Sequence, residues 1–190
     1  MEQANETDPH TSGGFAIEDS LAVWNIPANT WLAKHGKEHL LDGIATGIVV
    51  FGPGGKVLLV QRASHDSMPN RWEVPGGAVD VEDPSILFGG ARELLEETRF
   101  TAKRFMHVVN EEGQLFSNRT GMKTFCRFVF IVEVESSEGV RLDPNEHQDF
   151  LWASEEEVRK QRVEDRDTPI STPEIRTLIL KAFRIREQLC

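Results

Sequence analysis

The chain has 190 residues, of which 39% are hydrophobic and 27% are charged, and its formal net charge is −10. This length and composition are typical of one soluble globular domain, while the negative charge argues against a general nucleic-acid-binding groove. No apolar run approaches the roughly 20 residues that cross a bilayer, and two cysteines give no disulfide framework. We therefore expect a cytoplasmic protein, with the nucleus as an alternative, and no association with a membrane.

The first part of the chain changes in character at residue 15. Before it the sequence is polar, as in a disordered tail; after it come apolar residues that indicate an arm packed on the main domain, with a short helix near 28–35. We expect Trp24 and Trp31 to serve in this packing, with a substrate lid or the arm of a homodimer as the alternative. The tail, the arm and the main domain are expected over residues 1–14, 15–38 and 39–190.

The main domain begins with two near-continuous apolar runs on either side of Gly52-Pro53-Gly54-Gly55. Such runs are typical of a sheet buried on both faces, and the glycine-rich turn favours a hairpin between them. Further strands are expected over residues 72–75, 104–109, 124–134 and 150–152. Loops are expected over 110–123, which forms a flexible connection, and over 163–172.

Two helices follow near the end of the chain. Ser154 with Glu157 three residues later forms a capping box for a helix over 155–162, and an amphipathic helix is expected over 173–188. With helices on both faces of a mixed sheet, the pattern predicts an α/β fold.

An acidic helix lies in the middle of the chain. Asp83 and Pro84 resemble its N-cap and first turn. At about 100° per residue, Glu96 and Glu97 lie roughly 60° and 40° either side of Glu93, so the three carboxylates share one face. The three carboxylates repel one another. A bound cation such as Mg²⁺, which prefers oxygen ligands, would replace this repulsion by attraction to the ion. The alternative is an ordinary solvated acidic face.

The opposite side of this helix is expected to face the core through its apolar residues, namely Leu87, Ala91, Leu94 and Leu95. Gly89 and Gly90 lie on the carboxylate side and each cost about 1 kcal/mol relative to alanine in a helix interior. We expect them to make room for the loop over residues 77–83.

Residues 76–100 resemble the Nudix box, whose pattern is Gly, five residues, Glu, seven residues, then Arg-Glu-U-x-Glu-Glu-x-Gly-U, with U a bulky aliphatic residue. Residues 92–98, Arg-Glu-Leu-Leu-Glu-Glu-Thr, match its core, and Gly77 matches its first glycine. The resemblance implies an α/β/α sandwich with a mixed sheet.

The chain departs from the box at two places. The interval from Gly77 to Arg92 is one residue longer, so the isolated early acid is either Glu82 or Asp83. Arg99 stands where the box has glycine, and a left-handed conformation there would cost about 1–2 kcal/mol.

The resemblance also implies a reaction: hydrolysis of a nucleoside diphosphate linked to another group, or of a similar diphosphate, by attack of water on phosphorus, with Mg²⁺ or Mn²⁺ as cofactor. It places metal ligation on Glu93, Glu96, Glu97 and the backbone carbonyl at Gly77. Arg92 would orient a carboxylate by bidentate pairing.

The general base is left open by the resemblance. Glu93 and Glu96 are within reach, and Glu146 is the best candidate outside the helix, because family members often take an acid from that loop; the alternative for Glu146 is a solvated surface acid. His147 beside it is expected to be exposed, with a contact to substrate as the alternative. For the phosphates we expect Arg62 and Arg127, with a buried ion pair as the alternative for Arg127. The phenylalanines that could stack a base, although core packing is favoured for them, are Phe125, Phe128 and Phe130.

The resemblance implies that the substrate is a small diphosphate or nucleotide. The run Trp72-Glu73-Val74-Pro75-Gly76-Gly77 is similar to MutT-type enzymes, which act on nucleoside triphosphates including oxidised ones. The rival hypothesis is a non-catalytic Nudix-fold nucleotide sensor or interaction module. The three glutamates argue against that rival, because a binding module does not need their mutual repulsion.

Overall fold

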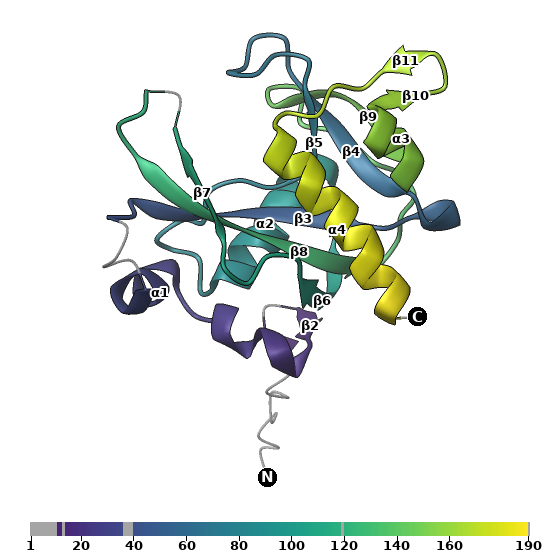
Figure 1. The fold of residues 1–190 in the computed structure, drawn as a ribbon. Helices are drawn as coiled ribbons and strands as arrows, with labels where there is room; N and C mark the ends of the chain where they lie inside the picture. The colour runs from purple at the N-terminus through teal and green to yellow at the C-terminus, as the bar shows by residue number, and fades with distance from the viewer. Residues whose placement is uncertain (1–10, 13, 36–39, 119, 190) are drawn as a thin grey trace.

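A computed structural model of the chain describes residues 11–12, 14–35, 40–118 and 120–189, with most of the strands in two sheets (Figure 1). The strands are β1 (Thr11–Ser12), β2 (Phe15–Ile17), β3 (Gly43–Val50), β4 (Val57–Arg62), β5 (Trp72–Glu73), β6 (Ala102–Val108), β7 (Gln114–Ser117), β8 (Thr124–Val134), β9 (His147–Ala153), β10 (Arg162–Val163) and β11 (Arg166–Asp167). The helices are α1 (Ala28–His35), α2 (Ile86–Thr98), α3 (Glu155–Lys160) and α4 (Pro173–Leu189), with 3₁₀ turns η1 (Asp19–Trp24) and η3 (Pro53–Gly55).

The larger sheet has the order β1-β2-β6-β8-β3, with β7 also paired to β8. Strand β8 lies at its centre, parallel to β3 and antiparallel to β6 and β7. The second sheet has the order β5-β4-β9, and β10 and β11 form a separate small hairpin. The expected mixed sheet is therefore confirmed.

Each face of the larger sheet is covered by a helix (Figure 1). Because side chains alternate along a strand, Ile48 and Val50 pack in the core that contains the apolar side of α2. Val49 between them packs in the core that contains α4. All three are fully buried. This double burial explains the continuous apolar run in β3 and confirms the α/β/α sandwich.

The expected hairpin at Gly52–Gly55 is wrong. Strand β3 belongs to the larger sheet and β4 to the second, and the two share only the bridge between Phe51 and Val57. The turn contains a short 3₁₀ segment with Gly54 and Gly55 at positive φ. The chain therefore uses this turn to pass from one sheet to the other, which places the two sheets side by side.

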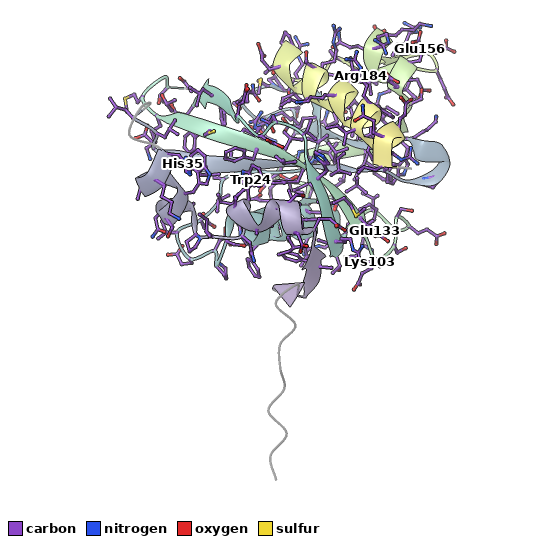
Figure 2. All side chains as sticks on the ribbon, turned by 60° about the horizontal axis from the view of Figure 1, so that its bottom comes forward. Trp24, His35, Lys103, Glu133, Glu156 and Arg184 are labelled. Carbon is purple, nitrogen blue, oxygen red and sulfur yellow. The ribbon has the colours of Figure 1, made fainter. Side chains whose placement is uncertain are left out.

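The N-terminal arm packs on the domain as expected. Trp24 is buried, with its ring centroid 5.9 Å from that of Phe128 and 6.1 Å from that of Phe130 (Figure 2). The ring of Trp31 also contacts Phe128 edge-on, with 5.1 Å between the two ring centroids. Both tryptophans therefore serve in packing. Of the predicted tail, residues 1–10 and 13 lie outside the described residues, whereas Thr11–Ser12 pairs with β2 as strand β1.

Helix α2 begins two residues later than the sequence indicates. Its N-cap is Ser85, whose hydroxyl accepts the backbone N–H of Phe88 at 3.1 Å, and not Asp83. Its C-cap, Arg99, has φ 62° and ψ 17°, so the left-handed conformation anticipated there is present. Leu95, expected in the core, is 43% exposed, because it lies at the edge of the apolar face.

Other boundaries differ in detail. Residues 110–123 contain β7, and 163–172 include β11, so neither is purely a loop. The capping box of α3 is present, with Ser154 and Glu157 satisfying each other's backbone N–H groups. Among the residues described, no helix combines the length and apolarity required to cross a bilayer.

Candidate active site

A cavity of about 400 Å³ opens where the C-terminal half of α2, the hairpin of β7 and β8, and the second sheet meet. Six of the residues singled out in the sequence line it: Arg62, Gly77, Glu93, Glu97, Arg127 and Glu146. Its other lining residues are Asp66, Glu73, Gly76, Ala78, Phe116, Phe125 and His147. Five carboxylates against two arginines make this a strongly acidic cavity.

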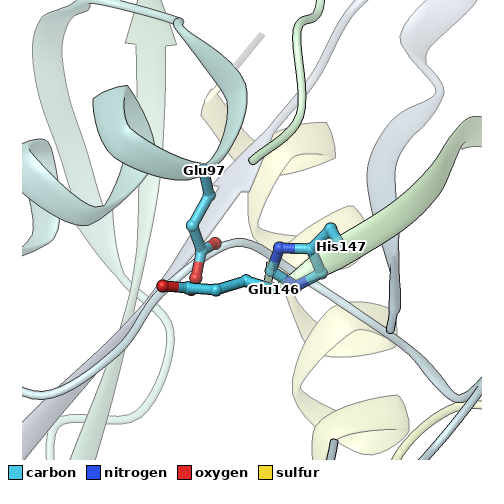
Figure 3. A group of neighbouring side chains, drawn as sticks. All are labelled: Glu97, Glu146 and His147. Atoms are coloured by element: carbon cyan, nitrogen blue, oxygen red, sulfur yellow. The ribbon is translucent and has the colours of Figure 1, made fainter. Parts of the chain in front are cut away.

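Three side chains converge within it. The ligating atoms of Glu97, Glu146 and His147 all lie within 4.8 Å of one another. Figure 3 shows Glu97 reaching down from α2 toward Glu146, in the turn before β9, and His147, the first residue of β9. Glu97 and His147 are each only 3% exposed, while Glu146 is exposed. The prediction that His147 is exposed is therefore wrong.

Glu97 is a buried carboxylate whose charge is poorly compensated. Burial raises its pKa well above the ordinary value of 4.5, and the negative charges of Glu73, Glu93 and Glu146 raise it further. The backbone N–H of Gly76, which donates to Glu97 Oε2 at 2.9 Å, acts in the opposite direction. A buried acid with so little compensation is what a cation site requires.

Glu93 lies beside Glu97, close to the main chain. A Cβ at Gly77 would stand 2.5 Å from Glu93 Oε2, so only glycine allows this approach. Burial raises the pKa of Glu93, although Arg92 opposes the change. The carbonyl of Gly77, the predicted backbone ligand, accepts the N–H of Thr46 at 2.8 Å.

Glu96 takes no part in lining the cavity in this structure. Its side chain is 55% exposed and pairs with Arg92 Nη1 at 3.0 Å, the same nitrogen that donates to Glu93 Oε1 at 2.8 Å. The three helix glutamates therefore share one face of α2, as expected, but do not converge on one point. Arg92 relieves the repulsion between two of them.

Arg92 also identifies the early acid of the box. Its Nε and Nη2 donate to the two oxygens of Asp83 at 3.1 and 2.9 Å, and Asp83 is buried, whereas Glu82 is exposed. The bidentate pairing expected of Arg92 is thus present, with Asp83 as its partner. Gly89 gives Asp83 its room, since a Cβ there would lie 2.9 Å from Asp83 Oδ2.

Gly90 has a different neighbour. A Cβ at Gly90 would meet Ile48 Cδ1 of β3 at 2.9 Å. The prediction that both helix glycines make room for the loop is therefore right for Gly89 and wrong for Gly90. Gly90 instead allows α2 to lie close to the larger sheet.

The two arginines of the cavity differ in their partners. Arg62 is held between Glu73 and Asp66, each with a nitrogen–oxygen distance of 2.5 Å; burial opposes its charge, but these carboxylates outweigh burial and raise its pKa. Arg127 has no carboxylate within 4.0 Å among the described residues, so the alternative of a buried ion pair is wrong. Burial lowers the pKa of Arg127.

Several cavity residues were not anticipated. Glu73 pairs with Arg62, and its Oε1 lies 3.7 Å from Nε2 of His147. Glu73 belongs to the run Trp72–Gly77 that resembles the family, and this position could have identified it from the sequence. Phe116 was hidden in a segment expected to be a flexible connection. Of the three phenylalanines considered for stacking, Phe128 and Phe130 are fully buried in the core and only Phe125 reaches the cavity.

The donor set fits a hard divalent cation. Carboxylate oxygens are the ligands that Mg²⁺ and Mn²⁺ prefer, and Glu97, Glu146 and the adjacent Glu93 supply them from two different elements. The Nδ1 atom of His147 is buried and without a hydrogen-bond partner in the described chain, so the site retains an unused donor or acceptor. The cavity beside it leaves space for a phosphate-containing ligand.

A family model described as a NUDIX domain matches residues 41–172. The chain belongs to the Nudix family. The matched segment includes α2 and the whole of the cavity described above, so the resemblance noted in the sequence is confirmed.

Relatives and solved structures agree with this assignment. The m7GpppN-mRNA hydrolase NUDT17 of Danio rerio is 45% identical over 85 residues, which are 43% of this chain and 25% of that protein. The match thus spans about a quarter of that relative's own length.

Two solved Nudix structures share the fold. The MutT protein of Methanosarcina mazei Go1 is 25% identical with a TM-score of 0.58, over 77% of this chain and 95% of that one. The Ap4A hydrolase of C. elegans is 22% identical with a TM-score of 0.60, over 77% and 98% of the two chains.

Proposed function

We propose that this Nudix protein is a Mg²⁺- or Mn²⁺-dependent pyrophosphohydrolase that cleaves a diphosphate bond in a nucleoside diphosphate derivative or a nucleoside triphosphate. The observation that carries the proposal is the convergence of Glu97 and Glu146 in a cavity that also holds Arg127, an arginine with no carboxylate partner among the residues that the structure describes. Two of the relatives are named for nucleotide substrates, m7GpppN-mRNA and Ap4A, which supports a nucleotide here.

The cation would be held by Glu97 and Glu146, with Glu96 as a further ligand if its side chain turns from Arg92 toward the cavity. Glu93 would be a ligand only where Glu146 serves as the base. When bound, it supplies positive charge opposite the phosphates and polarises water. The acidic cavity needs that charge before it can admit a polyphosphate, because like charges repel. Arg92 fixes Glu93 and the loop through Asp83, so that the ligands are held before substrate arrives.

Phosphate binding from the protein falls to Arg127. Arg127 lines the cavity, and burial destabilises its charge. A phosphate oxygen would supply the counter-charge that no side chain in the described part of the chain provides. Arg62 is already neutralised by Glu73 and Asp66. We therefore assign it to positioning, and assign direct phosphate contact to Arg127.

In the reaction, water attacks phosphorus as the anhydride oxygen leaves with its phosphate group. Glu93 is the base that accepts the proton of the water, because burial raises its pKa above that of an ordinary glutamate, which makes it a better proton acceptor. Glu146 is the alternative base. Arg92 Nη1 holds the Glu93 carboxylate in place through Oε1, which leaves Oε2 for the proton.

A hydrolysis screen, in which added pyrophosphatase and alkaline phosphatase convert pyrophosphate and monoester products to inorganic phosphate or the products are separated by chromatography, tests the proposal. Purified protein is incubated with nucleoside triphosphates, nucleotide sugars, dinucleotides and isoprenyl diphosphates, in Mg²⁺, in Mn²⁺ and in chelator. Metal-dependent cleavage of the nucleotides alone is expected. Nucleotide binding without turnover under any metal condition would instead support the non-catalytic sensor.

A further inference from the structure

His147 is a buried histidine of the cavity wall that the proposed reaction does not use. Its side chain is 3% exposed and lines the cavity. Its Nδ1 atom is buried and has no hydrogen-bond partner among the described residues. Because a buried polar atom without a partner costs free energy, the imidazole lacks a group that should be bound to it.

The fold brings this imidazole to two carboxylates. One oxygen of Glu97, one oxygen of Glu146 and one ring nitrogen of His147 all lie within 4.8 Å of one another. Figure 3 shows the imidazole with a ring nitrogen on the side of the Glu97 carboxylate. Donor atoms that share one ion, each about 2 Å from it, are at most about 4 Å apart. A small closure of the side chains is therefore enough for all three to bind one ion.

A β-bulge accompanies the placement of His147. The pairing of β9 with β4 shifts register between Gln61 and Arg62, so that β9 contains one extra residue, Gln148. Such a bulge re-aims the side chain beside it, and bulges are frequent next to active sites. The backbone N–H of His147 also donates to the carbonyl oxygen of Asp143 at 2.9 Å. The main chain that carries the imidazole is therefore held on both sides.

A carboxylate lies on the other side of the imidazole. Nε2 of His147 is 3.7 Å from Oε1 of Glu73, and the same oxygen is paired with Arg62. This distance is longer than a hydrogen bond, but a small turn of the ring would make it one. A histidine that binds a metal through one nitrogen commonly donates its other N–H to a carboxylate, which fixes the tautomer and the orientation of the ring.

A nitrogen donor changes which cation suits the site. Mg²⁺ is a hard cation that prefers oxygen ligands, whereas imidazole suits first-row transition metals, whose affinity rises from Mn²⁺ through Co²⁺. Resting on the function proposed above, we propose that His147 is a ligand of the divalent cation together with Glu97 and Glu146, so that this site selects transition-metal ions over Mg²⁺. Of the two cations proposed for the reaction, the site favours Mn²⁺.

Metal binding to the full chain without nucleotide tests this directly. Calorimetric titration gives the affinities for Co²⁺, Mn²⁺ and Mg²⁺, and pulsed electron paramagnetic resonance of the Mn²⁺-loaded protein detects nitrogen bound to the ion. We expect the affinity to fall in the order Co²⁺, Mn²⁺, Mg²⁺, and the Mn²⁺ spectrum to show coupling to an imidazole nitrogen. A bound Mn²⁺ without nitrogen coupling would overturn the proposal, and so would Mg²⁺ binding as tightly as Co²⁺.

A variant locates the nitrogen. His147→Asn offers an amide oxygen in place of the imidazole and should abolish the nitrogen coupling. It should weaken Co²⁺ binding about 10-fold or more, since even the loss of a group that only orients a ligand costs that much. Mg²⁺ binding should change less than about threefold, because an oxygen donor remains. His35→Asn, at an exposed histidine of α1, is the control and should change none of these.

Two results with His147→Asn would contradict the proposal. Nitrogen coupling that persists in this variant would place the nitrogen on another residue. An equal loss of Co²⁺ and Mg²⁺ binding would mean that His147 acts through the fold and not as a ligand.

Nucleotide hydrolysis is followed in the same preparations with Mn²⁺. Turnover with a metal site that contains only oxygen ligands would remove this inference and leave the proposed function intact. A nitrogen-bound metal without turnover of any nucleotide would do the reverse. The two ideas therefore fail separately.

Discussion

Replacement of Glu97 by glutamine removes one buried charge and keeps the shape of the side chain. In the wild type the carboxylate lies within 4.8 Å of that of Glu146 and accepts the N–H of Gly76. The amide oxygen of glutamine can accept the same hydrogen bond. Stability and activity should therefore change in opposite directions, which an ordinary structural glutamate would not allow.

The size of the stability change follows from Coulomb's law. Two unit charges 4.8 Å apart repel by about 1 kcal/mol at the dielectric constant of water and by about 3 kcal/mol at an effective protein value. Without metal, Glu97→Gln should therefore raise the free energy of unfolding by about 1–3 kcal/mol. For a domain of this size that raises Tm by about 3–9 °C.

The assay is thermal unfolding in chelator at pH 8.5, which favours the ionised carboxylate, followed by the same measurement in Mg²⁺. In Mg²⁺ the order should reverse, because only the wild type keeps its full set of ligands. Turnover should fall by about two orders of magnitude or more, since a charge opposite the phosphates is lost. Glu82→Gln, an exposed acid in the loop before α2, is the matched control for the change in net charge.

Two results would refute the reasoning. Unchanged turnover in Glu97→Gln would remove the assignment of this residue as a metal ligand. A variant that is less stable than the wild type in chelator would mean that the carboxylate charge is satisfied within the protein. In that case the raised pKa of Glu97 would not indicate a cation site.

The remaining predictions concern pH, phosphate binding and the end of α2. In chelator, Tm should fall as pH rises above about 4.5 toward neutrality. Burial raises the pKa of Glu97 and of Glu93 in the folded state, so the folded state binds more protons than the unfolded state. The folded state therefore loses stability as these two carboxyl groups ionise. Thermal scans of wild type and Glu97→Gln test this, and a slope no shallower in the variant would contradict it. Arg127→Met should raise KM for nucleotides about 10- to 100-fold, which corresponds to the loss of one charged hydrogen bond. It should not lower Tm, because burial already disfavours the arginine charge. An unchanged KM in steady-state kinetics would exclude a phosphate contact by Arg127. Arg99→Gly should stabilise the protein by about 1 kcal/mol, since glycine adopts φ 62° without strain, and a Tm that does not rise would show that the native cap carries no cost.

The sequence predicted the fold best where a single strong local pattern determines the structure. Strand β8 has the predicted bounds because its apolar run is long and continuous, and the capping box of α3 follows from two residues only three positions apart in the sequence. The hairpin at Gly52–Gly55 was mistaken for a physical reason. A turn signal specifies that the chain reverses, but not whether the two strands then join the same sheet.

The site was predicted in part. Spacing on a helix placed Glu93, Glu96 and Glu97 on one face, but it could not tell which of them would bind Arg92 and which would turn toward the cavity. His147 was misjudged because its burial depends on segments distant in the sequence, and Phe116 was not singled out because its segment was expected to be a flexible connection. Local composition, which is polar around both, gave no indication of that burial.

The cavity draws its acids from both halves of the sandwich. Glu93 and Glu97 come from the helix that covers the larger sheet, while Glu146 precedes the edge strand of the smaller one. The chain crosses between these halves at Gly52–Gly55 with a single backbone bridge nearby. An ion bound by acids from both halves would link them at this junction, so that binding of the ion would also make the molecule more rigid.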